Sequence, residues 1–186
     1  MKKILITGAL GYIGTELCKL YSGFSWKYEV VAIDNRFISE RVNELKRRKI
    51  KFIQADILDL EAIKIYIEKA DFVYHLAGIT DVAYVKKEAD KKKDNLTVRV
   101  AIEGTANVLA AMNSKSTIIF PSTHVVFEGL KEAKKDLDEN EKTNTFLAYS
   151  SSKVENEKQI IKSGKKYVIF RLGSVYGFST DTMRMN

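Results

Sequence analysis

The first fourteen residues constrain the fold of this chain more than any other stretch. The apolar run Ile4–Ile6 suits a buried strand, and it leads into three glycines in the spacing GxxGxxG, namely Gly8, Gly11 and Gly14. Residues 15–20 then have the composition of a helix. A strand, a tight glycine turn and a helix N-terminus together present free backbone N–H groups and the positive end of a helix dipole. The pattern predicts a site for the diphosphate of a dinucleotide.

A carboxylate stands where a dinucleotide site requires one. The apolar run 28–33 ends at Asp34, which follows the third glycine by about 20 residues, the usual separation. This carboxylate can accept hydrogen bonds from the adenosine ribose hydroxyls and would repel a 2′-phosphate, so it favours NAD over NADP. Arg36 keeps NADP open as an alternative, because a guanidinium group binds phosphate well.

Composition places the chain among ordinary globular proteins. Its 186 residues suffice for one domain, and 45% of them are hydrophobic and 30% charged. The single cysteine, Cys18, excludes an internal disulfide and fits a reducing compartment. No apolar run approaches the roughly 20 residues needed to cross a membrane, so we expect a cytoplasmic protein. Acidic residues lie among several of the lysine clusters behind the net charge of +7, which predicts solvated surfaces rather than binding to nucleic acid.

Strand and helix patterns alternate along the whole chain. Apolar runs predict strands at Lys3–Thr7, Tyr28–Ile33, Lys51–Gln54, Phe72–Leu76, Thr117–Pro121 and Tyr167–Arg171. Helical patterns fall between them, at Ile13–Tyr21, Ser39–Arg48, Leu60–Glu68, Asn95–Met112 and Leu147–Ser163. The polar stretch 127–145 predicts a loop of moderate length. The alternation indicates an α/β fold with a doubly wound parallel sheet, the Rossmann fold, which binds ligands at the carboxyl ends of its strands.

Two groups of residues near the fifth and sixth strands carry reactive chemistry. Tyr149 and Lys153 are spaced i, i+4, so on a helix the phenol and the ammonium group share a face. A nearby cation lowers the pKa of a phenol and makes it a usable proton acceptor near neutral pH. At the end of the preceding strand, Ser122 and Thr123 each offer a hydroxyl that could align a substrate oxygen with this phenol.

Taken together, these motifs resemble the NAD-dependent epimerase/dehydratase family, the extended short-chain dehydrogenases/reductases that act on nucleotide sugars. The matching segments run almost from end to end: TGALGYIG at 7–14, Asp34, Asp56-Ile57, HLAG at 75–78, Gly104-Thr105, PSTHVVF at 121–127, YSSSK at 149–153 and RLGSVYG at 171–177.

The resemblance implies a role for each matching residue. The cofactor NAD would be bound by Gly8, Gly11, Tyr12, Ile13 and Gly14 at the pyrophosphate, Asp34 and Asn35 at the ribose, Asp56 and Ile57 at the adenine, and Leu76, Ala77 and Gly78 along its length. Thr123 matches the catalytic hydroxyl, Tyr149 the base, and Lys153 both its electrostatic partner and a ligand of the nicotinamide ribose. No metal is implied.

The activity implied is that of a nucleotide-sugar epimerase, in which transient hydride abstraction by NAD gives a keto intermediate. Alternatives are an NAD(P)-dependent sugar or alcohol dehydrogenase or reductase, and a non-catalytic NAD-binding domain. The chain departs from the family pattern at Ala101, Phe127 and Ser174. His124 and Val125 stand where sugar 4,6-dehydratases carry an acidic pair, which favours an epimerase or a simple dehydrogenase or reductase.

The length of the chain also differs from the family pattern. The resemblance implies a smaller C-terminal domain that closes over the nucleotide sugar in other family members, and we expect this chain to lack that domain. Residues 1–186 would then be the NAD-binding Rossmann domain with the catalytic threonine, tyrosine and lysine. We expect it to bind NAD and to turn over sugar nucleotides poorly on its own. By the same resemblance, a homodimer would form through the helices near 95–112 and 147–163.

Overall fold

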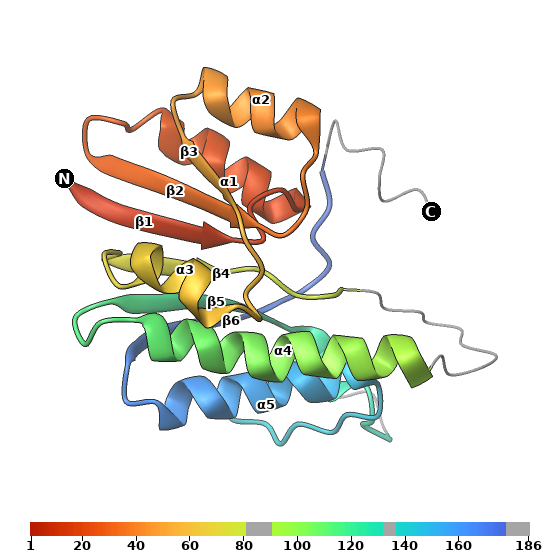
Figure 1. The fold of residues 1–186 in the computed structure, drawn as a ribbon. Coiled ribbons are helices and arrows are strands. Elements are labelled where there is room, and N and C mark those ends of the chain that lie inside the picture. The colour runs from red at the N-terminus through yellow and green to blue at the C-terminus, as the bar shows by residue number, and fades with distance from the viewer. Residues whose placement is uncertain (81–90, 132–136, 178–186) are drawn as a thin grey trace.

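The protein is built around one parallel sheet of six strands. The structure, a computed structural model, describes residues 1–80, 91–131 and 137–177 (Figure 1). The strand order is β3-β2-β1-β4-β5-β6, and every neighbouring pair is parallel. The strands are β1 (Lys2–Thr7), β2 (Tyr28–Asp34), β3 (Lys51–Gln54), β4 (Phe72–His75), β5 (Thr117–Thr123) and β6 (Lys166–Leu172). This order is that of the Rossmann fold, so the predicted fold class is confirmed.

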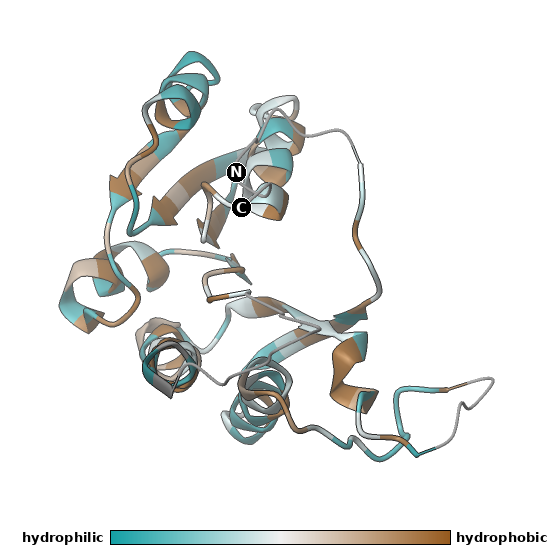
Figure 2. Cartoon of the chain, turned by 90° about the vertical axis from the view of Figure 1, so that its right-hand side faces the viewer, coloured by the Kyte–Doolittle hydropathy of each residue, from teal (hydrophilic) through white to brown (hydrophobic). Residues whose placement is uncertain are grey.

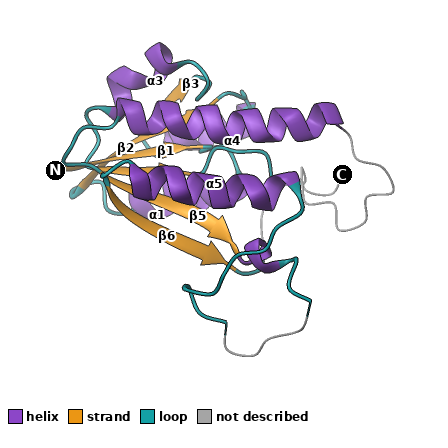
Figure 3. Ribbon diagram, turned by 90° about the horizontal axis from the view of Figure 1, so that it is seen from below, coloured by secondary structure: helices purple, strands orange, loops and turns teal. Residues whose placement is uncertain are grey.

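Helices connect the strands and cover both faces of the sheet. They are α1 (Tyr12–Ser22), α2 (Ser39–Arg47), α3 (Leu60–Ile67), α4 (Lys91–Ala111) and α5 (Ala148–Lys162), together with the short 3₁₀ helix η1 (His124–Phe127). Figure 2 views the molecule from the side toward which β1 points in Figure 1, and it shows helices on either side of the twisted sheet. On one face, α4 and α5 lie side by side (Figure 3).

Alternating side chains of the strands enter two separate apolar clusters. In β1, Ile4 and Ile6 pack beneath α1 and α2, whereas Leu5 packs on the opposite face with residues of α3, α4 and α5. Strands that are buried on both faces require near-continuous apolar sequence, which is what the chain provides.

The boundaries differ from expectation mainly at polar residues. The strand β5 continues through Pro121 to Thr123, because at Pro121 it pairs only with β6 and the missing N–H breaks no bond to β4. The helix α4 begins at Lys91, four residues before the predicted start, since its first residues are polar and give no apolar period. The loop expected at 127–145 is preceded by η1, which the sequence pattern did not predict.

The edge of the sheet at β6 is less well covered than its centre. None of the seven residues of β6 is buried, and Val168 and Phe170 are 40% and 51% exposed. In β1, by contrast, four of six residues are buried. In the described part of the chain, no helix is long and apolar enough to cross a membrane.

Candidate active site

The glycine turn after β1 is a cradle with no room for side chains. Gly8 has φ of +67°, and a Cβ on it would lie 2.7 Å from the backbone nitrogen of Ala77. A Cβ on Gly14 would lie 2.4 Å from the Gly8 carbonyl oxygen and 2.7 Å from the Cα of Ala9. Both contacts are with backbone, which cannot move aside. Gly8 is thus required by the turn and by β4, and Gly14 by the packing of α1 on the turn.

The N-terminus of α1 opens onto this turn. Gly11 is its N-cap residue and supplies no side chain to bond the first N–H groups, and the first turn contains no acidic residue. Tyr12 and Ile13 begin the helix and are half-buried. Uncapped N–H groups at the positive end of a helix dipole suit an anionic ligand.

The turn is held in place by the end of β2. The Ala9 N–H donates to the Ile33 carbonyl at 3.0 Å, and the Leu10 N–H donates to Asp34 Oδ2 at 3.0 Å. The guanidinium group of Arg41 donates to the Leu10 carbonyl. Asp34 therefore has a structural task that the sequence did not reveal, because its carboxylate positions the glycine turn.

Three predicted ribose and adenine ligands gather at the ends of β2 and β3. Asp34 is buried, and Oδ1 accepts hydrogen bonds from the backbone N–H of Arg36 at 3.0 Å and from Arg36 Nε at 3.1 Å. Asn35 Nδ2 donates to Asp56 Oδ2 at 3.1 Å. Ile57 differs from these polar neighbours, because its side chain is buried in the core.

The predicted residues of β4 and beyond lie next to the cradle. The Ala77 N–H donates to Thr7 Oγ1 at 3.2 Å, and Leu76 and Ala77 form the backbone wall against Gly8. Gly78 is exposed, and a Cβ there would meet open space. The contacts of these residues with a cofactor stay predictions.

Thr123 and Ser122 end β5 at the same edge of the sheet. Thr123 is buried, and its Oγ1 accepts a hydrogen bond from the Val125 N–H at 3.2 Å, which caps η1. Ser122 is also buried, and its hydroxyl has no hydrogen-bond partner among the described residues. A buried polar atom without a partner is rare, and it suits a ligand or water at this position.

Lys153 carries its charge into the interior beside Tyr149. Its Nζ donates to the Pro121 carbonyl at 2.8 Å and lies 4.4 Å from the centroid of the Phe120 ring and 5.9 Å from that of Tyr149. Burial lowers the pKa of Lys153 to about 8, against a smaller opposing effect of Glu157. Tyr149 is the second residue of α5 and is half-buried. The helix thus brings phenol and ammonium group together as the i, i+4 spacing predicted.

An ion pair extends the same face of α5. Glu157, four residues after Lys153, accepts two hydrogen bonds from Arg171 of β6, at 3.1 Å from Nε and 2.7 Å from Nη2. Arg171 also donates to the Glu139 carbonyl at 2.9 Å and lies over the ring of Phe127. The pair fastens α5 to β6. Continuing the four-residue spacing from Lys153 would have identified Glu157.

His75 links the cradle side of the sheet to α4. Its Nδ1 is 2.9 Å from Thr7 Oγ1 and its Nε2 is 3.0 Å from Thr105 Oγ1. Burial lowers the pKa of His75 to about 3, and the charge of Lys153 adds to this effect. The imidazole is therefore neutral at physiological pH and acts as a hydrogen-bonded part of the core.

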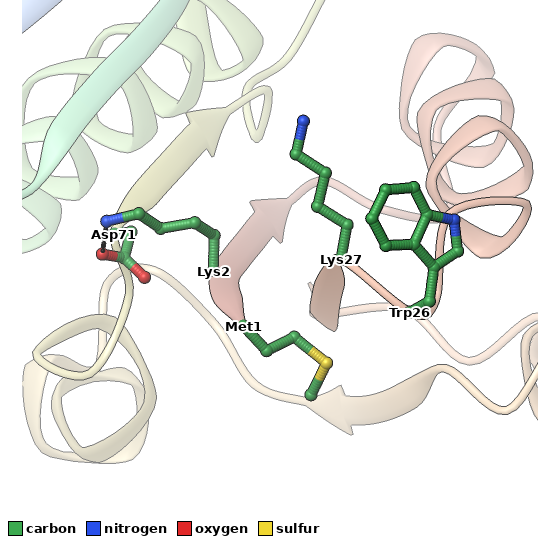
Figure 4. A pocket seen from close by; sticks show the side chains of 5 residues that line it. All are labelled: Met1, Lys2, Trp26, Lys27 and Asp71. Carbon is green, nitrogen blue, oxygen red and sulfur yellow. Dashed lines mark hydrogen bonds and ion pairs between the residues drawn. The ribbon is translucent and has the colours of Figure 1, made fainter.

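Other parts of the described chain offer no comparable chemistry. A hollow lined by Met1, Lys2, Trp26, Lys27 and Asp71 lies at the amino ends of β1 and β4, opposite the candidate site (Figure 4). Its polar contact is an ordinary surface ion pair between Lys2 and Asp71 at 2.8 Å. Within residues 1–80, 91–131 and 137–177, no group of three histidine, cysteine, aspartate or glutamate side chains could hold a metal ion.

Comparison with known families assigns the chain. The model of the NAD dependent epimerase/dehydratase family matches residues 4–185. The chain belongs to this family. The resemblance inferred from the glycine turn, the hydroxyl pair and the tyrosine–lysine pair is confirmed.

Individual relatives are epimerases of nucleotide sugars by name. UDP-glucose 4-epimerase of Mus musculus is 34% identical over 145 residues, which cover 68% of this chain and 39% of that protein. An uncharacterized UDP-glucose epimerase of Bacillus subtilis is 30% identical over 190 residues, covering 94% of this chain and 57% of that protein. UDP-glucuronic acid 4-epimerase of Bacillus cereus in complex with NAD superposes with a TM-score of 0.75 at 28% identity, covering 94% of this chain and 57% of that one.

Within this family, the chain spans only part of its relatives' length. It covers between 39% and 57% of the three proteins above. Other relatives carry out other types of reaction by name. They include a dTDP-D-glucose 4,6-dehydratase from Dictyostelium discoideum and a dTDP-4-dehydrorhamnose reductase from Aggregatibacter actinomycetemcomitans. Family members are thus epimerases, dehydratases and reductases.

Proposed function

We propose that this chain is the NAD-binding and catalytic portion of a nucleotide-sugar epimerase. The observation that carries the proposal is the face of α5 on which the half-buried Lys153 holds its ammonium group next to the Tyr149 ring. This face meets the end of β5, and the glycine cradle lies at the same edge of the sheet. Proton transfer and dinucleotide binding are thus served from one side of the molecule.

The residues at this edge fit a dinucleotide. Gly8 and Gly14 hold the turn tightly against the chain after β4 and against α1, where any Cβ would meet backbone, and the uncapped start of α1 suits an anion. The unpartnered hydroxyl of Ser122 adds a buried hydrogen-bonding group near Thr123. Asp34 stays bonded to Leu10 and Arg36, so its carboxylate is fixed before a ribose arrives. The family is NAD-dependent, and the carboxylate of Asp34 favours NAD over NADP.

The reaction assigns a task to each side chain. Bound NAD would supply the hydride acceptor and donor for the sugar carbon, and the turn of Gly8 and Gly14 with the start of α1 would hold its diphosphate. Tyr149 takes the proton of the sugar hydroxyl, and the positive charge of Lys153 stabilises the phenolate that must be present beforehand. Thr123 offers a hydroxyl that orients the same sugar oxygen. After reduction of the keto intermediate, the proton returns from Tyr149 to the sugar.

Two alternatives remain distinguishable in one assay. A dehydrogenase or reductase of the same family would change the net amount of NADH with each turnover, whereas an epimerase would leave it constant. A non-catalytic NAD-binding module would bind NAD and show no turnover. The half-buried ammonium group of Lys153 beside the Tyr149 phenol argues against such a module, because a binding module needs no proton acceptor.

Substitution of Tyr149 by Phe tests the proposal. We expect Tyr149→Phe to bind NAD with unchanged affinity and to lower turnover of UDP-glucose by about 100-fold to 10,000-fold, as for loss of a general base. Calorimetric titration with NAD and NMR of the sugar products give the two readouts. Tyr167→Phe, at an exposed tyrosine of β6, is the matched control. Unchanged turnover in Tyr149→Phe would remove the phenol from the mechanism.

Association of two copies through α4 and α5 is part of the same proposal. The two helices lie side by side on one face of the sheet, where a second copy could add its own pair (Figure 3). Light scattering of the purified chain would give the mass of a dimer, and a monomer at all concentrations would contradict it.

A further inference from the structure

The two residues proposed to contact the reacting sugar oxygen sit on different elements. Thr123 is the last residue of β5 and the N-cap of η1, and Tyr149 lies in the first turn of α5. A long polar connection separates them in the sequence. Their relative position therefore depends on contacts between η1 and the start of α5, which pack against each other.

Glu128 makes such a contact at the C-terminal end of η1. Its Oε1 accepts hydrogen bonds from the backbone N–H groups of Phe146 and Leu147, both at 2.9 Å, and from the hydroxyl of Ser150. Leu147 is the N-cap of α5 and provides no capping side chain, and the first turn of α5 contains no acidic residue. Glu128 supplies from another element the negative charge that stabilises a helix N-terminus.

Backbone bonds close the connection beside this carboxylate. The Gly129 N–H donates to the Asn144 carbonyl at 2.9 Å, and the Asn144 N–H donates to the Val126 carbonyl at 2.9 Å. Asn144 Nδ2 donates to the Gly129 carbonyl at 2.6 Å. The chain leaving η1 and the chain entering α5 are thus fixed to each other, and Glu128 is the side chain that joins η1 to the helix itself.

We propose that Glu128 is a positioning residue that holds the first turn of α5, and with it the Tyr149 phenol, in a fixed place relative to the Thr123 hydroxyl. The catalytic part of this inference rests on the proposed function, whereas the hydrogen-bonded brace does not. Ser150 is fully buried and directly follows Tyr149, so a shift of its hydroxyl would carry the phenol with it.

Two substitutions of Glu128 separate the effect of its hydrogen bonds from the effect of its charge. Glu128→Ala removes all three hydrogen bonds, and Glu128→Gln retains an acceptor oxygen while removing the charge. We expect Glu128→Ala to lower kcat for the nucleotide sugar by about 10-fold to 100-fold with little change in KM or in the affinity for NAD, because misplacement by an ångström costs this much. Glu128→Gln should lose less. Glu155→Ala removes a partly exposed carboxylate of the same helix, which forms a surface ion pair with Lys158 at 3.3 Å, and should match the unsubstituted chain.

Amide hydrogen exchange gives a readout that does not depend on turnover. Glu128→Ala should accelerate exchange in residues 144–152 and leave α1 unchanged. Unchanged exchange there would overturn the brace, and faster exchange with unchanged kcat would overturn the positioning role. A chain that binds no NAD, or whose turnover survives Tyr149→Phe, would instead contradict the proposed function, while exchange would still decide whether Glu128 holds the helix.

Discussion

The two halves of the sheet are stabilised in different ways. In the N-terminal half, formed by β1, β2 and β3 with α1 and α2, apolar side chains enter clusters on both faces and glycines set the turn. In the C-terminal half, formed by β5, β6, η1 and α5, Ile118, Phe120 and Ile160 join the core, but no residue of the edge strand β6 is buried, as at the opposite edge strand β3. The elements of this half are connected by the Glu157–Arg171 ion pair, by the Glu128 carboxylate at the start of α5 and by the Asn144 side chain in the loop.

The difference between the halves shows which contacts can be predicted from a sequence and which cannot. Apolar burial and glycine sterics produce patterns along the chain, with periods that can be recognised locally. Polar contacts between distant segments leave no such pattern. The N-terminal half can therefore be anticipated in detail, whereas the residues that arrange the proposed catalytic groups become visible only in three dimensions.

Two phenylalanines on neighbouring strands provide the sharpest contrast. Phe120 of β5 is 1% exposed, and Phe170 of β6 is 51% exposed. We expect Phe120→Ala to lower the free energy of unfolding by about 4 kcal/mol, because it leaves a cavity in the core. Phe170→Ala should lower it by less than about 1 kcal/mol, since that side chain is half in water already. Urea unfolding measures both, and equal losses would contradict the difference in burial between β5 and the edge strand β6.

The affinity of a Gly14 variant for NAD tests the role of the glycine turn in the N-terminal half. In Gly14→Ala the new Cβ meets the backbone of Gly8 and Ala9, so the turn must widen. We expect the affinity for NAD to fall by about 100-fold, equivalent to about 2.7 kcal/mol. Gly23→Ala, after α1, meets only an ordinary contact of 3.4 Å and serves as control in the same titration. Full affinity in Gly14→Ala would place the diphosphate elsewhere.

Breaking the ion pair between Glu157 and Arg171 tests how much this polar contact stabilises the C-terminal half. Glu157→Gln leaves the partly exposed Arg171 without its charge partner, so we expect a loss of about 2 kcal/mol, below that of a fully buried pair. Because Glu157 raises the pKa of Lys153, that pKa should fall below about 8 and the alkaline decline of kcat should begin at lower pH. Unfolding curves and pH profiles measure these effects, with Glu155→Gln as control. An unchanged profile would disconnect Glu157 from the lysine.

His75 of β4 lies between the two halves of the sheet, and we predict its effect on the pH dependence of stability. Its folded pKa of about 3 lies below the ordinary value of 6.5, so below that value the unfolded chain takes up a proton that the folded chain does not. Stability should therefore fall as pH decreases from 6.5, by up to about 1.4 kcal/mol per pH unit. His75→Gln should remove this contribution, and His124→Gln, at an exposed histidine, should retain it. Parallel pH dependence in all three proteins would contradict a neutral His75.

Much of the fold was predictable for physical reasons. All six strands were expected within two residues of their observed ends, because each is a run of apolar or β-branched residues. The start of α4 at Lys91 was missed, since lysines on a solvated turn carry no period. The helix η1 was missed because three of its four residues are apolar and continue the pattern of β5.

The candidate site was predictable where residues act through local spacing. Gly8 and Gly14 behave as their turn requires, and Tyr149 and Lys153 share a helix face. Glu128 could not be found this way, because its partners lie beyond the loop. The second role of Asp34, as an acceptor for the Leu10 N–H, was hidden for the same reason.

The closure between Gly129 and Asn144 has a consequence for how this chain can vary. Because Gly129 and Asn144 are hydrogen-bonded to each other, the spacing of Thr123 and Tyr149 is set where this loop closes and not by the number of residues in the loop. Changes of length between these two residues therefore leave the closure itself intact, provided that the Glu139 carbonyl keeps its hydrogen bond from Arg171.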